Sequence, residues 1–122
     1  MIKLMLVLGA AFAGLAVILG AFAAHGLKGS LSSASLQVFQ TGVQYQMYHG
    51  LALILFALVA KQGVALMGPA ALLVAGIVLF SGSLYLLSTL GWKWLGPITP
   101  LGGLCFIGAW VWFVVQVIRT EF

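Results

Sequence analysis

The chain has 122 residues, of which 64% are hydrophobic and only 5% are charged. This composition excludes a water-soluble globular domain, because six charged side chains cannot cover the surface of such a fold, whereas the hydrocarbon core of a bilayer requires none. The net charge of +4 is scattered at the ends of apolar runs instead of forming a patch, which argues against nucleic-acid binding. We therefore expect an all-α integral membrane protein embedded in the lipid bilayer.

The first apolar run, residues 4–24, contains no charged side chain. At 1.5 Å of rise per residue it reaches about 31 Å, enough to cross a hydrocarbon core of about 30 Å. A cleaved signal peptide is the alternative, since Lys3 precedes the run and residues 21–23 resemble a cleavage site. We favour a transmembrane helix, because small residues that let another helix approach recur at steps of three and four. They are Gly9, Ala13, Ala16, Gly20 and Ala24.

A short loop over residues 25–31 follows the first span and contains His25 and Lys28. A histidine at a helix end can bond the last carbonyls and interacts favourably with the negative helix terminus, so we interpret His25 as a capping residue. Ser32 or Ser33 is placed to cap the next helix by accepting a hydrogen bond from its first amides.

The second helix is predicted to begin before the membrane does. An apolar stripe and separate polar faces make its first turns amphipathic, which favours an interfacial start over about residues 33–43. The embedded part is expected over about 41–60, and the turn at 61–63 is short enough to require an antiparallel hairpin. The apolar stripe is Leu36, Phe39 and Val43, and the polar residues are Gln37, Gln40, Thr41 and Gln44.

A third span is predicted over about residues 66–90. Pro69 is tolerable in its first turn, and Gly91 is placed to end it. Trp92 and Trp94 follow at once, and indoles on both sides of a lysine just past a span are typical headgroup anchors. These features indicate a second interfacial loop.

Thr99 followed by Pro100 predicts the start of the fourth span, with threonine as the cap and proline at the first helical position. This span is expected over about residues 100–118. Four spans place both termini on one side of an antiparallel four-helix bundle. The positive-inside rule favours cytoplasmic termini, by three basic residues against two. The three are Lys3, Lys61 and Arg119, and the two are Lys28 and Lys93.

The densest polar segment, residues 44–49, falls inside the second span. Polar side chains at membrane depth are costly unless they are paired. Folding the second helix onto the third about Val64 would place His49 beside residue 79, and folding it onto the first would place His49 near Ala11 and Gln46 near Gly14. The sequence therefore predicts a polar seam among the first three helices. Its members are Tyr45, Gln46, His49, Ser81, Ser83 and Tyr85.

Two interpretations of this polar seam are open. The one we favour is structural: the side chains tie helices together by hydrogen bonds worth about 0.6 kcal/mol each in membranes. The other is a small site for a proton, a quinone or a lipid headgroup. The serines of the third span need no ligand, since serines in apolar helices often bond carbonyls of their own helix. Trp110 and Trp112 are interpreted as packing or lipid contacts.

No cofactor, metal or catalytic constellation is expected. A single histidine without an intramembrane carboxylate is a poor proton relay. A haem held by two histidines is disfavoured, because His25 is predicted at the interface and His49 about 12 Å deeper along its helix. Cys105 is the only cysteine, so the chain has no internal disulfide.

Four stretches resemble a family of small bacterial inner-membrane proteins typified by YgdD, with animal relatives called transmembrane protein 256. They are LGAFAAHG at 19–26, FQTGVQYQMYHGL at 39–51, FSGSLYLL at 80–87 and GPITPLGG at 96–103. The family is of unknown function. The resemblance therefore implies a four-span fold in the inner membrane and no particular reaction, substrate or cofactor.

Our leading functional hypothesis is a non-enzymatic accessory or assembly subunit of a larger membrane complex, or a homo-oligomer. It is motivated by small loops, glycine-lined helices and the lack of a catalytic constellation. The alternative is a proton-linked small-solute carrier or channel that uses His49, Gln46, Ser81 and Ser83 of the polar seam.

Overall fold

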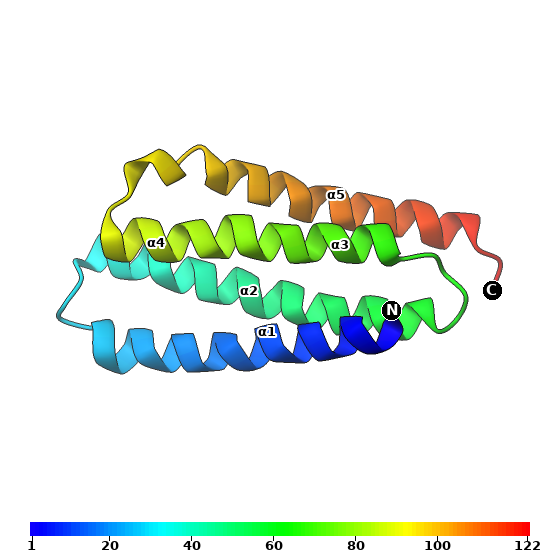
Figure 1. Cartoon of the computed structure of the whole chain (residues 1–122), viewed down its shortest axis with the longest axis horizontal. Helices are drawn as coiled ribbons and strands as arrows, with labels where there is room; N and C mark the ends of the chain where they lie inside the picture. Colours follow the sequence, from blue (N-terminus) through cyan, green and yellow to red (C-terminus); the bar gives the residue numbers. More distant parts are fainter.

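The computed structural model describes residues 1–122 as four long antiparallel helical rods without a β-strand (Figure 1). This confirms the predicted all-α, four-helix architecture, and each rod is long and apolar enough to cross a membrane. Two rods contain a π-helical segment, labelled η1 or η2, and the last rod is preceded by a 3-10 turn, η3. The elements are α1 (Ile2–Phe22), η1 (Ala23–Leu27), α2 (Ser33–Ala60), α3 (Met67–Gly76), η2 (Ile77–Ser81), α4 (Gly82–Leu90), η3 (Lys93–Leu95) and α5 (Ile98–Arg119).

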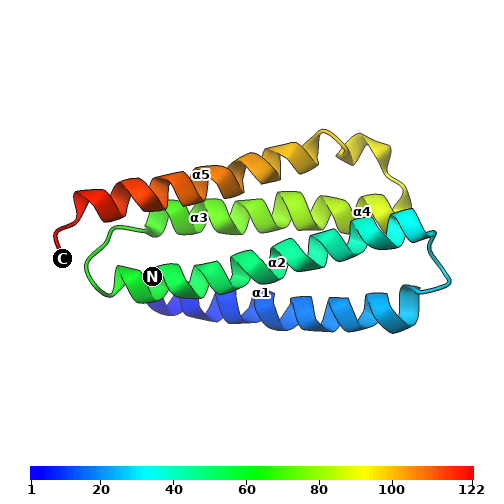
Figure 2. The same cartoon turned by 180° about the vertical axis from the view of Figure 1, so that it is seen from behind.

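The rods lie side by side in chain order, and both termini are at the same end of the bundle (Figures 1 and 2). α1 packs almost entirely on α2, and α5 packs on the rod formed by α3, η2 and α4. α1 and α5 are therefore the outer rods. Only 17% of the central apolar stretch is buried in each outer rod, against 39% in each inner rod, so the outer rods offer most of the surface that lipid must cover.

Local sequence signals account for several helix ends. The Ser32 side chain accepts a hydrogen bond from the Ser35 amide at 3.1 Å, which confirms the predicted cap of α2. Pro69 lies in the first turn of α3, where its missing N–H breaks no helical hydrogen bond. Gly91 ends α4 in the left-handed conformation, with φ of 69°.

The predicted start of the last helix is wrong. α5 begins at Ile98 after Pro97, whose backbone is already helical, so Thr99 and Pro100 lie inside the first turn. Pro100 is still tolerated there, because the first amides of a helix have no partner to lose. Thr99 does not cap the helix, and its hydroxyl instead lies 2.6 Å from the Ser83 hydroxyl of α4.

The predicted capping role of His25 is also not observed. His25 lies within η1, the π-helical end of the first rod, where its side chain is exposed and makes no hydrogen bond to the chain. It still lies in the last turn, where a protonated histidine interacts favourably with the helix terminus.

Glycines bring α1 and α2 into backbone contact. A Cβ atom on Gly9 would lie 2.7 Å from the Gly50 carbonyl oxygen, and one on Gly50 would lie 3.1 Å from the Ala13 amide nitrogen. Ala16, further along the same stripe of α1, is fully buried. The predicted small-residue stripe therefore has its partner helix within the chain.

The apolar core and the buried polar residues occupy different halves of the bundle. Apolar side chains such as Phe56, Leu66 and Leu73 fill the half that carries the termini. The buried polar side chains lie from the middle towards the opposite loops, and they are Gln46, His49, Ser81, Ser83 and Ser88. The candidate functional side chains therefore lie in the half of the bundle away from the termini.

We expect Gly9→Ala to lower the free energy of unfolding by about 1–3 kcal/mol, because the added methyl group meets the backbone of α2. Gly14→Ala is the matched control on the same helix, since a Cβ there meets no atom within 4 Å. It should be neutral or stabilising by up to about 1 kcal/mol. Unfolding of both variants in mixed micelles provides the measurement. Equal stability of the two variants would contradict the proposed close contact.

Candidate functional site

Gln46 connects three helices through its side-chain amide. Its Nε2 donates to the Phe12 carbonyl of α1 at 2.9 Å, and its Oε1 accepts from the Tyr85 hydroxyl of α4 at 2.7 Å. The side chain is 2% exposed, so both ends of the amide are satisfied away from solvent. Folding the second helix onto the first predicted the contact with α1 to within two residues, since Gln46 was expected beside Gly14 and is bonded to Phe12.

Ser81 makes a second contact between helices. Its hydroxyl donates to the Gly42 carbonyl of α2 at 2.6 Å. A Cβ on Gly42 would lie 2.8 Å from the Tyr85 ring and 3.3 Å from the Ser81 carbonyl, so only glycine allows this approach. The expectation that serines of the third span bond their own helix is therefore wrong for Ser81. It is right for Ser88, which donates to the Tyr85 carbonyl.

Ser83 lies apart from these contacts. Its hydroxyl is 2.9 Å from the Phe80 carbonyl and 2.6 Å from the Thr99 hydroxyl at the start of α5. The residues of the predicted polar seam therefore form separate hydrogen-bonded contacts, of which this one joins the third and fourth rods near the loop.

His49 is directed toward α5. Its Nδ1 lies 2.8 Å from the Tyr45 carbonyl, and the Trp110 indole N–H donates to its Nε2 at 3.1 Å. An indole nitrogen can only donate, so Nε2 is the acceptor and Nδ1 carries the proton in the neutral ring. The ring also stacks on Phe106, with centroids 3.6 Å apart. His49 is thus fixed in one tautomer and one orientation.

The predicted surroundings of His49 are wrong. His49 was expected between the first three helices near Ala11, whereas its partners are Trp110 and Phe106 of α5. Trp110 packs edge-on against Phe56, as interpreted, but it also donates the hydrogen bond that orients the histidine. The sequence contains one signal for this role. An indole N–H at membrane depth requires a hydrogen-bond acceptor, and the chain has few side-chain acceptors within its spans.

Tyr45 lines an aromatic groove beside His49. The groove has a volume of about 410 Å³ and lies between α2, η2 and α5. Of the predicted site residues it contains only Tyr45 and His49. Tyr45 is 37% exposed, and its hydroxyl makes no hydrogen bond within the chain. The lining residues are Tyr45, His49, Phe80, Gly103, Phe106, Ile107 and Trp110.

A second polar surface lies on the outside of α2, which we call the glutamine face. It comprises Gln37, Gln40, Thr41 and Gln44, and with Gly20 of α1 it forms a shallow hollow. Gln44 lies about 17 Å of helix rise beyond Ser33, so this face extends well along the rod. The Gln44 amide is bonded only to the exposed Tyr48 of the same helix, with Nε2 to hydroxyl 2.6 Å. Lipid tails cannot satisfy such groups.

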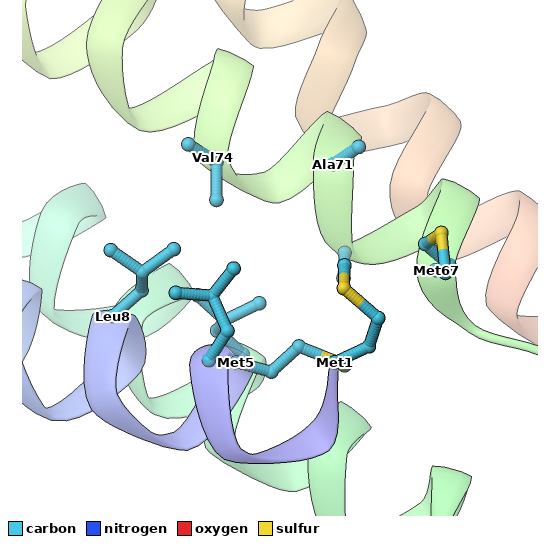
Figure 3. Close-up of a pocket in the computed structure, with 9 residues that line it drawn as sticks. Met1, Met5, Leu8, Met67, Ala71 and Val74 are labelled. Atoms are coloured by element: carbon cyan, nitrogen blue, oxygen red, sulfur yellow. The ribbon is translucent and has the colours of Figure 1, made fainter.

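An apolar groove lies between α1 and α3 at the end that carries the termini. Figure 3 shows Met1, which precedes α1, and Met5 of α1 facing Met67 and Val74 of α3. The groove has a volume of about 260 Å³, and all nine lining residues are hydrophobic. Flexible methionines suit contact with lipid tails, and nothing in this groove can carry chemistry.

The loops at the far end contain the other predicted interfacial residues. Residues 28–32 and 91–97 lie at the end opposite the termini (Figure 1). Lys28 is exposed there, and so are Trp92 and Trp94, whose rings stack with centroids 6.1 Å apart. No group of three or more histidine, cysteine or acidic side chains comes together in the structure.

Four helical rods that are long and apolar enough to cross a membrane, joined by polar contacts at mid-helix, define a multi-pass membrane protein. The family model described as "Protein of unknown function (DUF423)" matches residues 19–103. The UPF0382 membrane protein YwdK of Bacillus subtilis is 51% identical over 96% of this chain and 98% of its own length. A UPF0382 membrane protein of Staphylococcus haemolyticus is 42% identical over 96% and 97%. The chain belongs to this family of membrane proteins. No solved structure matches it.

A double-mutant cycle can test the Gln46 bridge. Tyr85→Phe removes one hydrogen bond and Gln46→Leu removes two, so we expect each to destabilise the bundle. Because the two residues share a bond, the changes should be coupled by about 0.6 kcal/mol and at most about 1.7 kcal/mol. Unfolding in mixed micelles gives the free energies. Tyr48→Phe is the control, since its exposed hydroxyl bonds only within α2. Strict additivity would contradict the bridge.

The orientation of His49 predicts its tautomer. In the neutral ring the proton should be on Nδ1, because Nε2 accepts from Trp110. Nitrogen NMR of protein labelled at histidine distinguishes the two tautomers. Trp110→Phe should leave the proton on Nδ1, which still donates to the Tyr45 carbonyl, but should shift the Nε2 resonance by removing its donor. Trp112→Phe should leave that resonance unchanged, since Trp112 packs over Gly68. A wild-type ring protonated on Nε2 would show that the hydrogen bond does not exist.

Proposed function

We propose that this protein acts by association within the bilayer, as a non-enzymatic accessory or assembly subunit of a membrane complex or as a homo-oligomer. The observation that supports this role is the glutamine face. Its amides lie on the outside of a rod that is apolar enough to cross a membrane. Its inner residues Thr41 and Gln44 lie in the stretch predicted to be embedded, where a polar surface requires hydrogen-bonding partners that lipid tails cannot supply.

The chemistry of the glutamine face favours another helix as the partner. Gln37 and Gln40 are exposed, uncharged, and carry both donors and acceptors, so they can pair with polar side chains of either kind. Two copies of the same face are also complementary to each other, as a twofold interface requires. The hollow over Gly20 leaves room for a neighbouring side chain. The short loops offer little surface for a partner in water.

The alternative of a proton-linked carrier or channel is less favoured. Gln46, Ser81 and Ser83 are each bonded to a group of the chain, and both nitrogens of His49 are used. A transported ion or solute would have to break these contacts. We place the protein in the bacterial plasma (inner) membrane with cytoplasmic termini, on the distribution of its basic residues.

The proposed association can be tested by photocrosslinking in native membranes. A photoreactive residue at position 40 should give a defined crosslinked band, which mass spectrometry can assign to a second copy or to another membrane protein. The control is the same residue at position 111 of α5, because Val111 is 58% exposed and lies on an outer apolar surface. Equal crosslinking at both positions, or none at position 40, would contradict the proposal.

Variants can then assign the affinity to the glutamine face. Combining Gln40→Leu with Gln44→Leu should raise the dissociation constant of the complex about five- to tenfold, as expected for two hydrogen bonds in a membrane. Native mass spectrometry from nanodiscs measures the distribution of species. Gln62→Leu, in the turn after α2, is the matched control and should have no effect. A strictly monomeric wild type without partners would overturn the proposal.

A further inference from the structure

We propose that the aromatic groove between α2, η2 and α5 binds a neutral, lipid-dissolved molecule of the quinone class, with a ring and a carbonyl acceptor. This goes beyond the proposed association, because the groove does not involve the glutamine face. Its volume of about 410 Å³ falls within the usual range of ligand sites. Its lining also follows the usual pattern, in which apolar and aromatic walls carry a few oriented polar groups.

One lining position of the groove, Gly103, has no side chain. A Cβ on Gly103 would meet a single atom within 4 Å, the Phe80 Cδ2 at 3.9 Å. The space over Gly103 is therefore open, whereas the adjacent Gly102 is in contact with the Phe80 backbone. Helix packing in this region requires a glycine at position 102 but not at position 103.

The walls of the groove are flat rings held in place by one another. The Tyr45 ring lies 4.8 Å from Phe80 and 6.3 Å from Phe106, between ring centroids. Phe106 stacks on His49, which Trp110 orients by its hydrogen bond. Aromatic rings favour offset-stacked or edge contacts with another ring at such distances. This arrangement favours a planar ligand over a flexible chain.

Among the polar residues that line the groove, only Tyr45 has a hydrogen-bonding group without a partner in the chain. His49 uses both ring nitrogens and Trp110 uses its N–H. A hydroxyl at membrane depth gains by donating to an acceptor, and lipid tails offer none. The ligand should therefore present an oxygen acceptor such as a ring carbonyl.

The depth of the groove selects among acceptor-bearing lipids. Tyr45 lies near the midpoint of α2, which has 28 residues, and Phe80 and Phe106 lie near the middle of the other two rods. A bilayer centred on the bundle therefore places the groove deeper than the embedded stretch 41–60 predicted from the sequence implied. A group at the bilayer centre is about 15 Å from either surface of the hydrocarbon core. Phospholipid esters and headgroups stay near those surfaces, whereas a neutral carbonyl-bearing ring can dissolve in the interior. These constraints together point to a quinone ring.

Binding can be measured in nanodiscs by tryptophan fluorescence with decylubiquinone as the probe. Wild-type protein should show saturable quenching, because Trp110 lines the groove. Tyr45→Phe should raise the half-saturating mole fraction about three- to tenfold by removing the hydrogen bond. The matched control Tyr48→Phe should leave it unchanged, since Tyr48 bonds to Gln44 outside the groove. Decylbenzene, which lacks carbonyls, should compete only weakly.

A second variant narrows the groove without touching its polar groups. Gly103→Val should raise the half-saturating mole fraction, and a circular dichroism spectrum and melting curve like those of the wild type would show that the bundle is intact. Quenching that rises linearly in the wild type, an unchanged value in Tyr45→Phe, or equal competition by decylbenzene would each overturn the inference. Loss of crosslinking at the glutamine face would leave these measurements unaffected, so the two proposals fail separately.

Discussion

Gly9 and Gly50 bring the backbones of α1 and α2 into contact, and in a bilayer this contact matters more than it would in water. Lipid tails are as apolar as leucine, so helices gain nothing merely by hiding apolar surface from lipid. They associate through close packing and hydrogen bonds. Close approach at glycine supplies the packing, and it also brings backbone carbonyls of one helix within reach of side chains from another.

Two hydrogen bonds between helices lie where a glycine allows such an approach. Gln46 reaches the Phe12 carbonyl where α1 lies against α2, and Ser81 reaches the carbonyl of Gly42 itself. A carbonyl already used within its own helix has a second lone pair, so it can accept such a bond without loss. Small residues and polar residues therefore work as pairs in this fold, and either kind alone would be less effective.

Two features lie outside this internally satisfied network. The glutamine face presents amides on the outside of α2, and Tyr45, whose hydroxyl has no partner in the chain, lines an aromatic groove. Both are unusual because a bilayer penalises polar groups that lack partners. They differ in their walls: the glutamine face is shallow and polar, suited to a helix, and the groove is lined by aromatic rings, suited to a small planar molecule. The family description names no activity, so these two surfaces are where a function can be sought.

The four spans, the antiparallel order, the cap at Ser32 and the stop at Gly91 could be predicted from the sequence, because they depend on the length of apolar runs and on neighbouring residues. Hairpin folding also placed Gln46 within two residues of its Phe12 partner, since the loop limits the register of adjacent helices. The docking of α5 could not be predicted in this way. In the docked helix the Trp110 indole donates to His49, the Thr99 hydroxyl lies beside the Ser83 hydroxyl, and a groove remains over Gly103. The rotation of one rod against another depends on side-chain packing between distant segments, and no local pattern in the chain specifies it.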